Sequence, residues 1–425
     1  MNAALAFSLI VFFAISIPVA ISIALASIFS ITFFSNLPLL VVPQKIFTGL
    51  DSFPLMAVPF FILAGNLMTK GGISHRLVDF AKSVIGGMQG GLASTTVMAC
   101  MIFAAISGSS IATTFAIGAI LIPAMVRHGY PIQMAASIQA SSAELGVIIP
   151  PSVPLILFAV STETSITQLF LAGLGPGLLV SASLVIMVQV WCRIKGYGKD
   201  DGNERTSLVP SFINAFWALM MPVIILGGIY GGIFTPTEAA AVAVFYALFL
   251  GLFVYKEMKF SDLPDLFRGA AVTSGAVMLI IGAASLFSFL ISLSGMPNAI
   301  GAWAQETFGA AWTFLLAINV LLFFVGMFIE TSAAILVLAP ILTPVAIAFG
   351  IDPVHFGVVV VVNLALGMFT PPLGVNLFAA AQVAEVPVQR LFYSLVVPVL
   401  TVITALMIIT YVPQVSLFLR DFILT

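Results

Sequence analysis

The chain has 425 residues, of which 61% are hydrophobic and only 7% are charged, with a formal net charge of −2. Soluble globular domains carry about 25% charged residues, so this composition excludes an ordinary soluble protein and gives no basic surface for nucleic acid. Many apolar stretches exceed the roughly 20 residues that cross a hydrocarbon core of about 30 Å. The sequence therefore predicts an all-α polytopic membrane protein.

The apolar pattern predicts a series of spanning or half-spanning helices. The first run has no basic region before it and is too long for the core of a signal peptide, so we expect a retained helix. The expected segments are 4–33, 54–69, 91–126 (a hairpin), 131–162 (broken), 166–192, 212–232, 236–255, 269–293, 309–348 (a second hairpin), 354–383 (broken) and 390–418. Interfacial amphipathic helices are expected at 40–52, 72–87 and 297–306.

A hairpin followed by a broken helix occurs twice in the chain. Each hairpin has a polar tip, Ser107–Ser110 in the first half and Glu330–Ser332 in the second, and each broken helix carries a Pro-Pro pair. Turn-type residues recur at one offset of 221 positions: Pro123 with Pro344, Gly129 with Gly350, Gly146 with Gly367, Pro150 with Pro371, and Pro151 with Pro372. Paired breaks in corresponding places are typical of the ion and substrate sites of secondary transporters.

The distribution of Lys and Arg predicts the orientation. Cytoplasmic loops of membrane proteins carry an excess of these residues. In this topology two cations, Lys45 and Arg420, fall on one face of the membrane, and twelve fall on the other: Lys70, Arg76, Lys82, Arg127, Arg193, Lys195, Lys199, Arg205, Lys256, Lys259, Arg268 and Arg390. We therefore expect a cytoplasmic N-terminus, a C-terminus outside, and inverted repeats whose hairpins enter from opposite sides.

The tips and breaks offer oxygen ligands at membrane depth. Proline removes a backbone donor and frees carbonyls upstream, while the tips add hydroxyl groups. Such hard oxygens suit an alkali cation, and neighbouring helix N-termini favour an anion. A single break or tip is explained as well by a helix kink or by Ser/Thr contacts between helices. The repetition of break and tip together favours a transport site.

Three acidic residues receive different interpretations. Glu330 at the second tip and Glu144 before the first break are interpreted as ligands or tuners of a cation site, because an ionised group at mid-membrane is costly; the alternative is a hydrogen bond to backbone N–H groups. Glu238 follows Thr235 and Pro236 in the pattern of a capping box and is interpreted as structural. Asn363 and Asn376 flank the second break, where either could also join two helices.

Two motifs resemble those of a known family. The stretches 145–152 (LGVIIPPS) and 232–240 (GIFTPTEAA) are similar to the large membrane subunit of tripartite ATP-independent periplasmic (TRAP) transporters, and the resemblance covers essentially the whole chain. It implies the elevator-type ion-transporter superfamily fold, in which a moving transport domain carries both hairpins and both broken helices. The domains expected are 1–90 (scaffold helices and interfacial arm), 91–165 (first transport half), 166–308 (scaffold and second arm), 309–385 (second transport half) and 386–425 (C-terminal helix).

The resemblance also implies the ligands. Two Na⁺ sites would be formed, the first by Ser107, Ser109, Gly146, Ile149 and Pro151, and the second by Gly326, Thr331, Gly367 and Thr370. The substrate would lie between the tips, near Ser109, Ser110, Thr331, Ser332 and Asn376. Family substrates are organic acids, including sialic acid and C4-dicarboxylates.

The resemblance implies two protein partners, a smaller four-helix membrane subunit and a periplasmic substrate-binding protein, besides the lipid of a bacterial inner membrane. We expect sodium-coupled uptake of an organic anion. One alternative is a stand-alone carboxylate transporter that needs no binding protein. A membrane enzyme or structural subunit is disfavoured, because the three histidines (His75, His128 and His355) form no metal-ligand or nucleophile–base pattern, and no nucleotide-binding glycine motif occurs.

Overall fold

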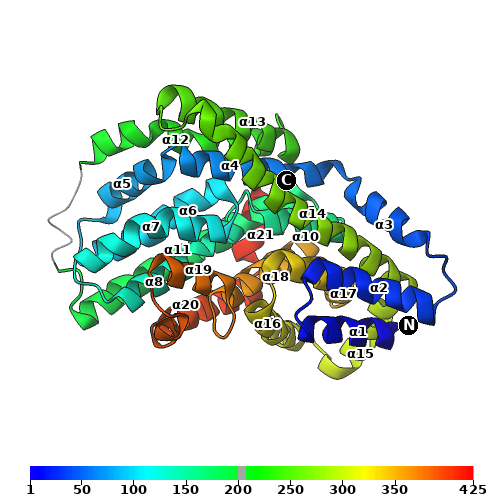
Figure 1. Ribbon diagram of the computed structural model, residues 1–425. Coiled ribbons are helices and arrows are strands. Elements are labelled where there is room, and N and C mark those ends of the chain that lie inside the picture. Colours follow the sequence, from blue (N-terminus) through cyan, green and yellow to red (C-terminus); the bar gives the residue numbers. More distant parts are fainter. Residues whose placement is uncertain (200–206, 425) are drawn as a thin grey trace.

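The computed structural model describes residues 1–199 and 207–424, and every regular element within these residues is a helix (Figure 1). In this part of the chain nine helices are long and apolar enough to cross a membrane, and one bent pair of segments adds a tenth candidate crossing. Arg205, one of the cations in the predicted orientation, lies outside the described residues. The prediction of an all-α polytopic membrane protein is confirmed.

The first repeat contains a hairpin, a broken helix and a long crossing helix. The hairpin turns at Gly108, whose φ of 61° is accessible to glycine without a steric penalty. The broken helix is interrupted between Ile149 and Ser152, where Ser152 caps the next segment. In chain order the elements are α5 (Ile73–Ile85), α6 (Gly91–Ser107), α7 (Ser110–Arg127), α8 (Ile132–Ala143), α9 (Leu145–Ile148), α10 (Val153–Thr162) and α11 (Ile166–Lys195).

The second repeat has a hairpin, a broken helix and a further long helix in the same order, with α18 in the place of α8 and α9 and a short η5 before the last helix. Adding 221 to the first and last residue numbers of α7 gives the bounds of the corresponding helix, Thr331–Ala348. The peptide bonds Pro150–Pro151 and Pro371–Pro372 are both cis. The elements are α15 (Met296–Phe308), α16 (Ala311–Phe328), α17 (Thr331–Ala348), α18 (Pro353–Met368), α19 (Val375–Val383), η5 (Val388–Leu391) and α20 (Phe392–Tyr411).

The two repeats pack together reciprocally. The second half of each broken helix lies against the returning arm of the other repeat's hairpin, so that α10 contacts α17 and α19 contacts α7. Helix α9 also contacts α18. This exchange brings the two breaks into the middle of the molecule, as expected for repeats related by a twofold axis in the membrane plane.

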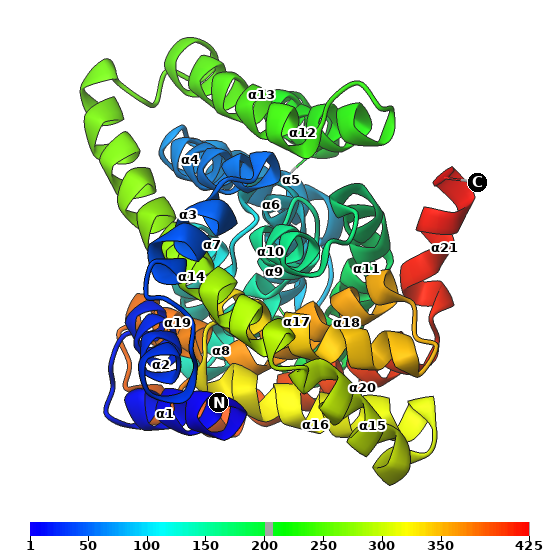
Figure 2. The ribbon, with the colours of Figure 1, turned by 90° about the vertical axis from the view of Figure 1, so that its right-hand side faces the viewer.

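Most of the remaining helices pack among themselves and against the outside of the repeats, whereas α21 packs against α11 (Figure 2). Helix α4 packs against α13, α12 against α5, and α14 against α2 and α3. The predicted capping box of Thr235 and Glu238 is present at the start of α13. These elements are α1 (Asn2–Ala14), α2 (Val19–Phe34), α3 (Val41–Leu50), η1 (Phe53–Met56), α4 (Ala57–Lys70), α12 (Leu208–Tyr230), α13 (Pro236–Phe249), η3 (Leu250–Val254), η4 (Phe260–Asp262), α14 (Leu263–Leu293) and α21 (Gln414–Leu424).

Two predicted segments are wrong in their extent. The run 4–33 is not one helix, because a turn with Ser16 at φ 61° and Pro18 divides it into α1 and α2, which pack against each other. The run 390–418 ends as a spanning helix at Tyr411, since Pro413 separates the short α21 from α20. The predicted cytoplasmic N-terminus depended on a single crossing over 4–33, so the orientation proposed below is revised.

From the sequence, α11 is expected in the scaffold segment 166–308, but in the structure this helix lies beside the hairpins. It contacts α6, α9, α10 and α18 from the two repeats, as well as α20 and α21. The division into moving and static parts stays a prediction, and this packing supports the addition of α11 and α20 to the part that carries the hairpins.

Candidate functional site: two oxygen-lined breaks

The first break lies directly against the first hairpin tip. A Cβ atom on Gly146 would lie 2.7 Å from the carbonyl oxygen of Ser109, and one on Gly108 would lie 2.7 Å from that of Pro151. Only glycine permits such close approaches between two backbones. The Ser107 hydroxyl is buried at the same place, 3.4 Å from the Ser109 carbonyl oxygen. Four of the five residues predicted for the first cation site are therefore neighbours.

Sequence reasoning missed Thr113 as a fifth polar group at this break. Its Oγ1 donates to the Ser109 carbonyl at 2.8 Å and lies 3.1 Å from Oγ of Ser107. The signal was available, because Thr113 follows Ser109 by four positions and a helix places such residues on one face. For Ile149, the contacts concern other atoms: its N–H donates to the Leu145 carbonyl and its side chain packs against Gly177.

The second break is built on a close contact between α16 and α18. A Cβ on Gly367 would lie 2.4 to 2.5 Å from backbone carbons of Gly326, so the two helices touch through these glycines. Thr370 follows at the C-terminal end of α18, where its N–H donates to the Gly367 carbonyl at 3.0 Å. The Thr331 hydroxyl donates to Sδ of Met368 at 2.8 Å. The structure thus places all four residues of the second predicted cation site around one break.

The residues predicted to bind the substrate lie in two places, one where α7 and α19 begin and the other at the tip of α17. Ser110 is buried at the first turn of α7, and the fully buried Asn376 lies in the first turn of α19, which packs along α7. Ser332 belongs to the tip of α17, where its hydroxyl donates to Glu330 at 2.9 Å. Helix α17 packs against α10, α14 and α18.

Glu330 serves as the N-cap of α17. Its carboxylate accepts the backbone N–H groups of Ser332 and Ala333 at 2.9 and 3.2 Å. A carboxylate at a helix N-terminus is stabilised by these donors and by the helix dipole. This geometry corresponds to the structural alternative for Glu330, the backbone hydrogen bond at the tip.

Glu144 joins the two repeats. Its side chain is buried, and Nδ2 of Asn376 donates to its Oε1 across 232 positions of sequence. The other carboxylate oxygen and the Asn376 carboxamide oxygen have no hydrogen-bond partner among the described residues. The pair of Glu144 and Asn376 therefore adds two buried acceptor oxygens to the region between the breaks.

The donor atoms are of the kind that hard cations bind. The atoms at both breaks are carbonyl and hydroxyl oxygens, the hard ligands that alkali and alkaline-earth cations accept, and the described residues hold no cluster of three His, Cys, Asp or Glu side chains for a transition metal. The glycines bring backbone oxygens close to the tip without intervening side chains.

Inverted repeats with reciprocally packed hairpins and two oxygen-lined breaks define a secondary transporter of the membrane. A family model described as the tripartite ATP-independent periplasmic transporter, DctM component, matches residues 6–415. The chain belongs to this family and is a TRAP transporter large permease, not an enzyme.

Relatives along the full length agree. The chain is 39% identical to the C4-dicarboxylate TRAP transporter large permease DctM of Rhodobacter capsulatus, with 99% of each chain covered. It is 38% identical to the sialic acid TRAP transporter large permease SiaM of Vibrio cholerae, covering 90% of this chain and 89% of that protein. Its fold is similar to the YdaH transporter of Alcanivorax borkumensis, with a TM-score of 0.66 at 15% identity over 88% and 89% of the chains.

Proposed function

We propose that this permease couples the inward movement of Na⁺ to the uptake of an organic anion of the sialic acid or C4-dicarboxylate class. The observation that carries the proposal is the pair of breaks, each with carbonyl and hydroxyl oxygens held against a hairpin tip. Each break binds one Na⁺ as cargo. The residues at the first break are Ser107, Ser109, Gly146, Ile149 and Pro151. Those at the second break are Gly326, Thr331, Gly367 and Thr370.

The anion would bind between the breaks. Helix α19 begins at Val375 without a side-chain cap, so its first N–H groups are available to a carboxylate. Ser110 at the start of the neighbouring α7 adds hydroxyl and backbone donors, and Asn376 adds a carboxamide. Sodium bound nearby would supply the positive charge that the membrane-embedded site otherwise lacks. The named relatives transport C4-dicarboxylate and sialic acid, which supports the class.

Transport would follow an elevator movement. The hairpins, both broken helices, α11 and α20 interlock across the repeats and would move as one body against α4, α12, α13 and α14. With both sodium ions and the anion in place, the polar groups at the breaks are satisfied, so the loaded body can cross the apolar zone at lower cost than a partly loaded one. Because the partly loaded body moves at a higher cost, sodium and the anion cross the membrane together.

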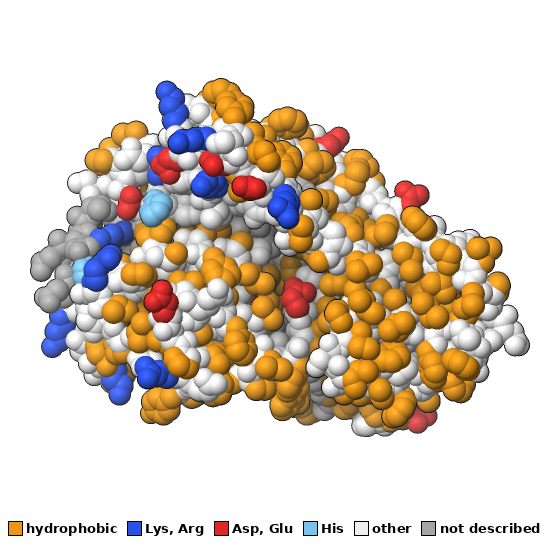
Figure 3. Space-filling view, in the orientation of Figure 1, with side chains coloured by type: hydrophobic (Ala, Val, Ile, Leu, Met, Phe, Trp, Pro, Cys, Tyr) orange, Lys and Arg blue, Asp and Glu red, His pale blue; other side chains and the backbone are white. Residues whose placement is uncertain are grey.

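The orientation we propose places the Lys- and Arg-rich face in the cytoplasm. Figure 3 shows these side chains gathered on the left of the molecule, whereas the right side is mostly hydrophobic. Since α1 and α2 form a hairpin, the N-terminus then lies on the periplasmic side, as does the C-terminus. The protein is a multi-pass membrane transporter, and the inner membrane follows from its family.

TRAP large permeases work with a small membrane subunit and a periplasmic binding protein, and both are expected partners here. The experiment reconstitutes the permease and small subunit in proteoliposomes and measures uptake of a labelled organic-acid panel. We expect uptake only with an inward sodium gradient and the loaded binding protein. Uptake that persists when choline replaces sodium contradicts the coupling. Uptake without the binding protein supports the stand-alone alternative.

A further inference from the structure

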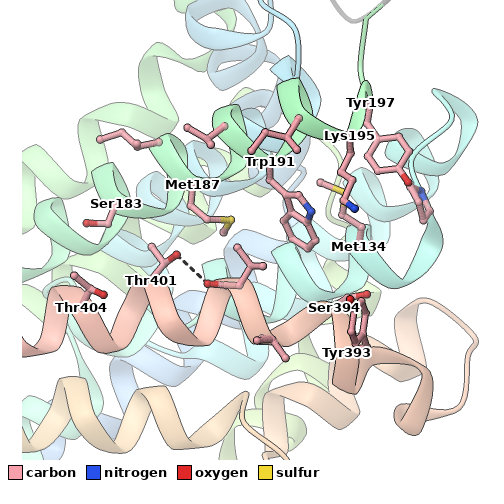
Figure 4. Close-up of a pocket in the computed structure, with 16 residues that line it drawn as sticks. Met134, Ser183, Met187, Trp191, Lys195, Tyr197, Tyr393, Ser394, Thr401 and Thr404 are labelled. Atoms are coloured by element: carbon pink, nitrogen blue, oxygen red, sulfur yellow. Dashed lines mark hydrogen bonds between the residues drawn. The ribbon is translucent and has the colours of Figure 1, made fainter.

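A lateral groove runs between α11 and α20, away from the breaks. Its volume is about 910 Å³, and its lining comes from α11, α20 and the start of α8 (Figure 4). Within the described residues the lining contains no carboxylate and one cation, Lys195 in the last turn of α11.

The long walls of the groove are apolar. Ile186, Val190 and Val396 line it and are 64%, 49% and 50% exposed, so they face outward from the protein. Of the four Ser and Thr residues in the lining, Ser394 lies next to Tyr393, and the other three each donate to a carbonyl of their own helix at 2.8 or 2.9 Å, which leaves no free hydrogen for a ligand: Ser183, Thr401 and Thr404. The walls therefore suit hydrocarbon rather than a polar substrate.

One end of the groove is polar and aromatic. Figure 4 shows Lys195, Tyr197 and Tyr393 together at that end, with Trp191 pointing into the groove beside them. Antiparallel α11 and α20 place the last turn of one helix beside the first turn of the other, which gathers these side chains. Tyr, Trp and Lys occur together where the hydrocarbon region meets the headgroups.

The depth of the groove corresponds to one leaflet. Ser183 lies twelve positions before Lys195 on α11, which is about 18 Å along a helix at roughly 1.5 Å per residue. Half of a hydrocarbon core is about 15 Å thick. A transmembrane helix of a partner would instead need a contact face along the whole bilayer.

We propose that this groove binds one phospholipid with an acidic headgroup, in the leaflet on the Lys- and Arg-rich side. Its phosphate lies at Lys195 among the two tyrosines, and an acyl chain runs past Trp191 and Val190 to Ser183. Since α11 and α20 pack on the hairpins and broken helices, the lipid is carried by the same body as the transport site.

Native mass spectrometry of the purified permease with added phosphatidylglycerol or phosphatidylcholine tests the proposal. Val190→Trp fills the groove and should abolish the retained lipid, whereas Leu178→Trp, an exposed position on α11 outside the groove, should not. Lys195→Gln should lower the affinity for phosphatidylglycerol about fivefold and leave phosphatidylcholine unchanged, since one lysine near anionic lipid supplies about that factor. Lys70→Gln, also in the last turn of a helix, is the charge control.

A second measurement does not depend on the variants. Brominated phosphatidylglycerol should quench the fluorescence of Trp191, measured as the difference between the wild type and Trp191→Phe. Equal lipid retention in Val190→Trp and Leu178→Trp, or no quenching of Trp191, overturns the proposal. Loss of the small subunit in Val190→Trp with lipid retention intact would also overturn it and assign the groove to that partner.

Discussion

Gly146→Ala is the sharpest perturbation of the first cation site, because the structure specifies what the added methyl group meets. The Cβ would lie 2.7 Å from the carbonyl oxygen of Ser109 and 2.8 Å from Oγ1 of Thr113. Ordinary contacts begin near 3.4 Å, so the tip must retreat by roughly 0.7 Å. The oxygens that would hold Na⁺ are the atoms that move.

We expect two effects of different size. Overpacking of a tight site costs about 1–3 kcal/mol, which a membrane protein of this size tolerates with reduced stability. Displacement of the Ser109 carbonyl from the site should weaken sodium binding at least tenfold, equivalent to about 1.4 kcal/mol. The stability of the folded state should therefore fall modestly, while its dependence on sodium should shrink toward the contribution of the second site alone.

The assay is thermal unfolding in detergent across a sodium series at constant ionic strength, with choline as the replacement. The wild-type Tm should rise with sodium, because a ligand that binds only the folded state stabilises it. Gly146→Ala should show a much smaller rise over the same range. Gly227→Ala is the control, since nothing lies within 4 Å of its added Cβ. A wild-type sodium response in Gly146→Ala would refute the placement of the site.

Three further predictions concern stability. Gly367→Ala should lower Tm more than Gly146→Ala, because its Cβ would meet the backbone of Gly326 at 2.4 to 2.5 Å; similar losses would contradict the packing. Asn319→Leu should cost about 1–3 kcal/mol in denaturant unfolding, because it removes the carboxamide that accepts from Asn363 at 2.8 Å inside the helix bundle; an unchanged midpoint would contradict this. Burial alone would raise the pKa of Asp352, but hydrogen bonds from Arg420 and backbone N–H groups hold that pKa below its usual value. The ionised carboxylate therefore stabilises the fold above about pH 4, and up to about 1 kcal/mol should be lost as the pH falls further. Asp352→Asn should lack this part of the acid transition in a pH series of Tm, and an identical profile would argue against the ion pair.

The repeat architecture was predictable because its signals are local. Proline and glycine mark the breaks and turns, and their common offset, seen for Gly129 and Gly350 among others, also fixes the order of the helices between them. The division of 4–33 into two helices was not predictable from hydropathy. Pro18 within an apolar run is equally compatible with a kinked crossing, and only the packing of α1 on α2 decides between them.

The sequence was sufficient to predict which residues of the first candidate site lie near one another, but not their contacts with the other repeat. Ser107, Ser109 and Gly146 converge because tip and break share one repeat. The contact of Glu144 with Asn376 joins residues 232 positions apart, and no local pattern encodes such a pairing. Likewise, the engagement of Ser332 by Glu330 depends on the rotamers at the tip.

The most direct test of sodium coupling counts both cargoes in the same vesicles. Proteoliposomes with the permease and small subunit receive ²²Na⁺ outside, and labelled organic acid is added with its binding protein. We predict that the acid stimulates sodium entry in a fixed ratio. If more sodium charges than substrate charges cross, a negative interior accelerates both fluxes, with about 2.3 kcal/mol per net charge for each 100 mV. Uptake of the acid without accompanying sodium would contradict the account.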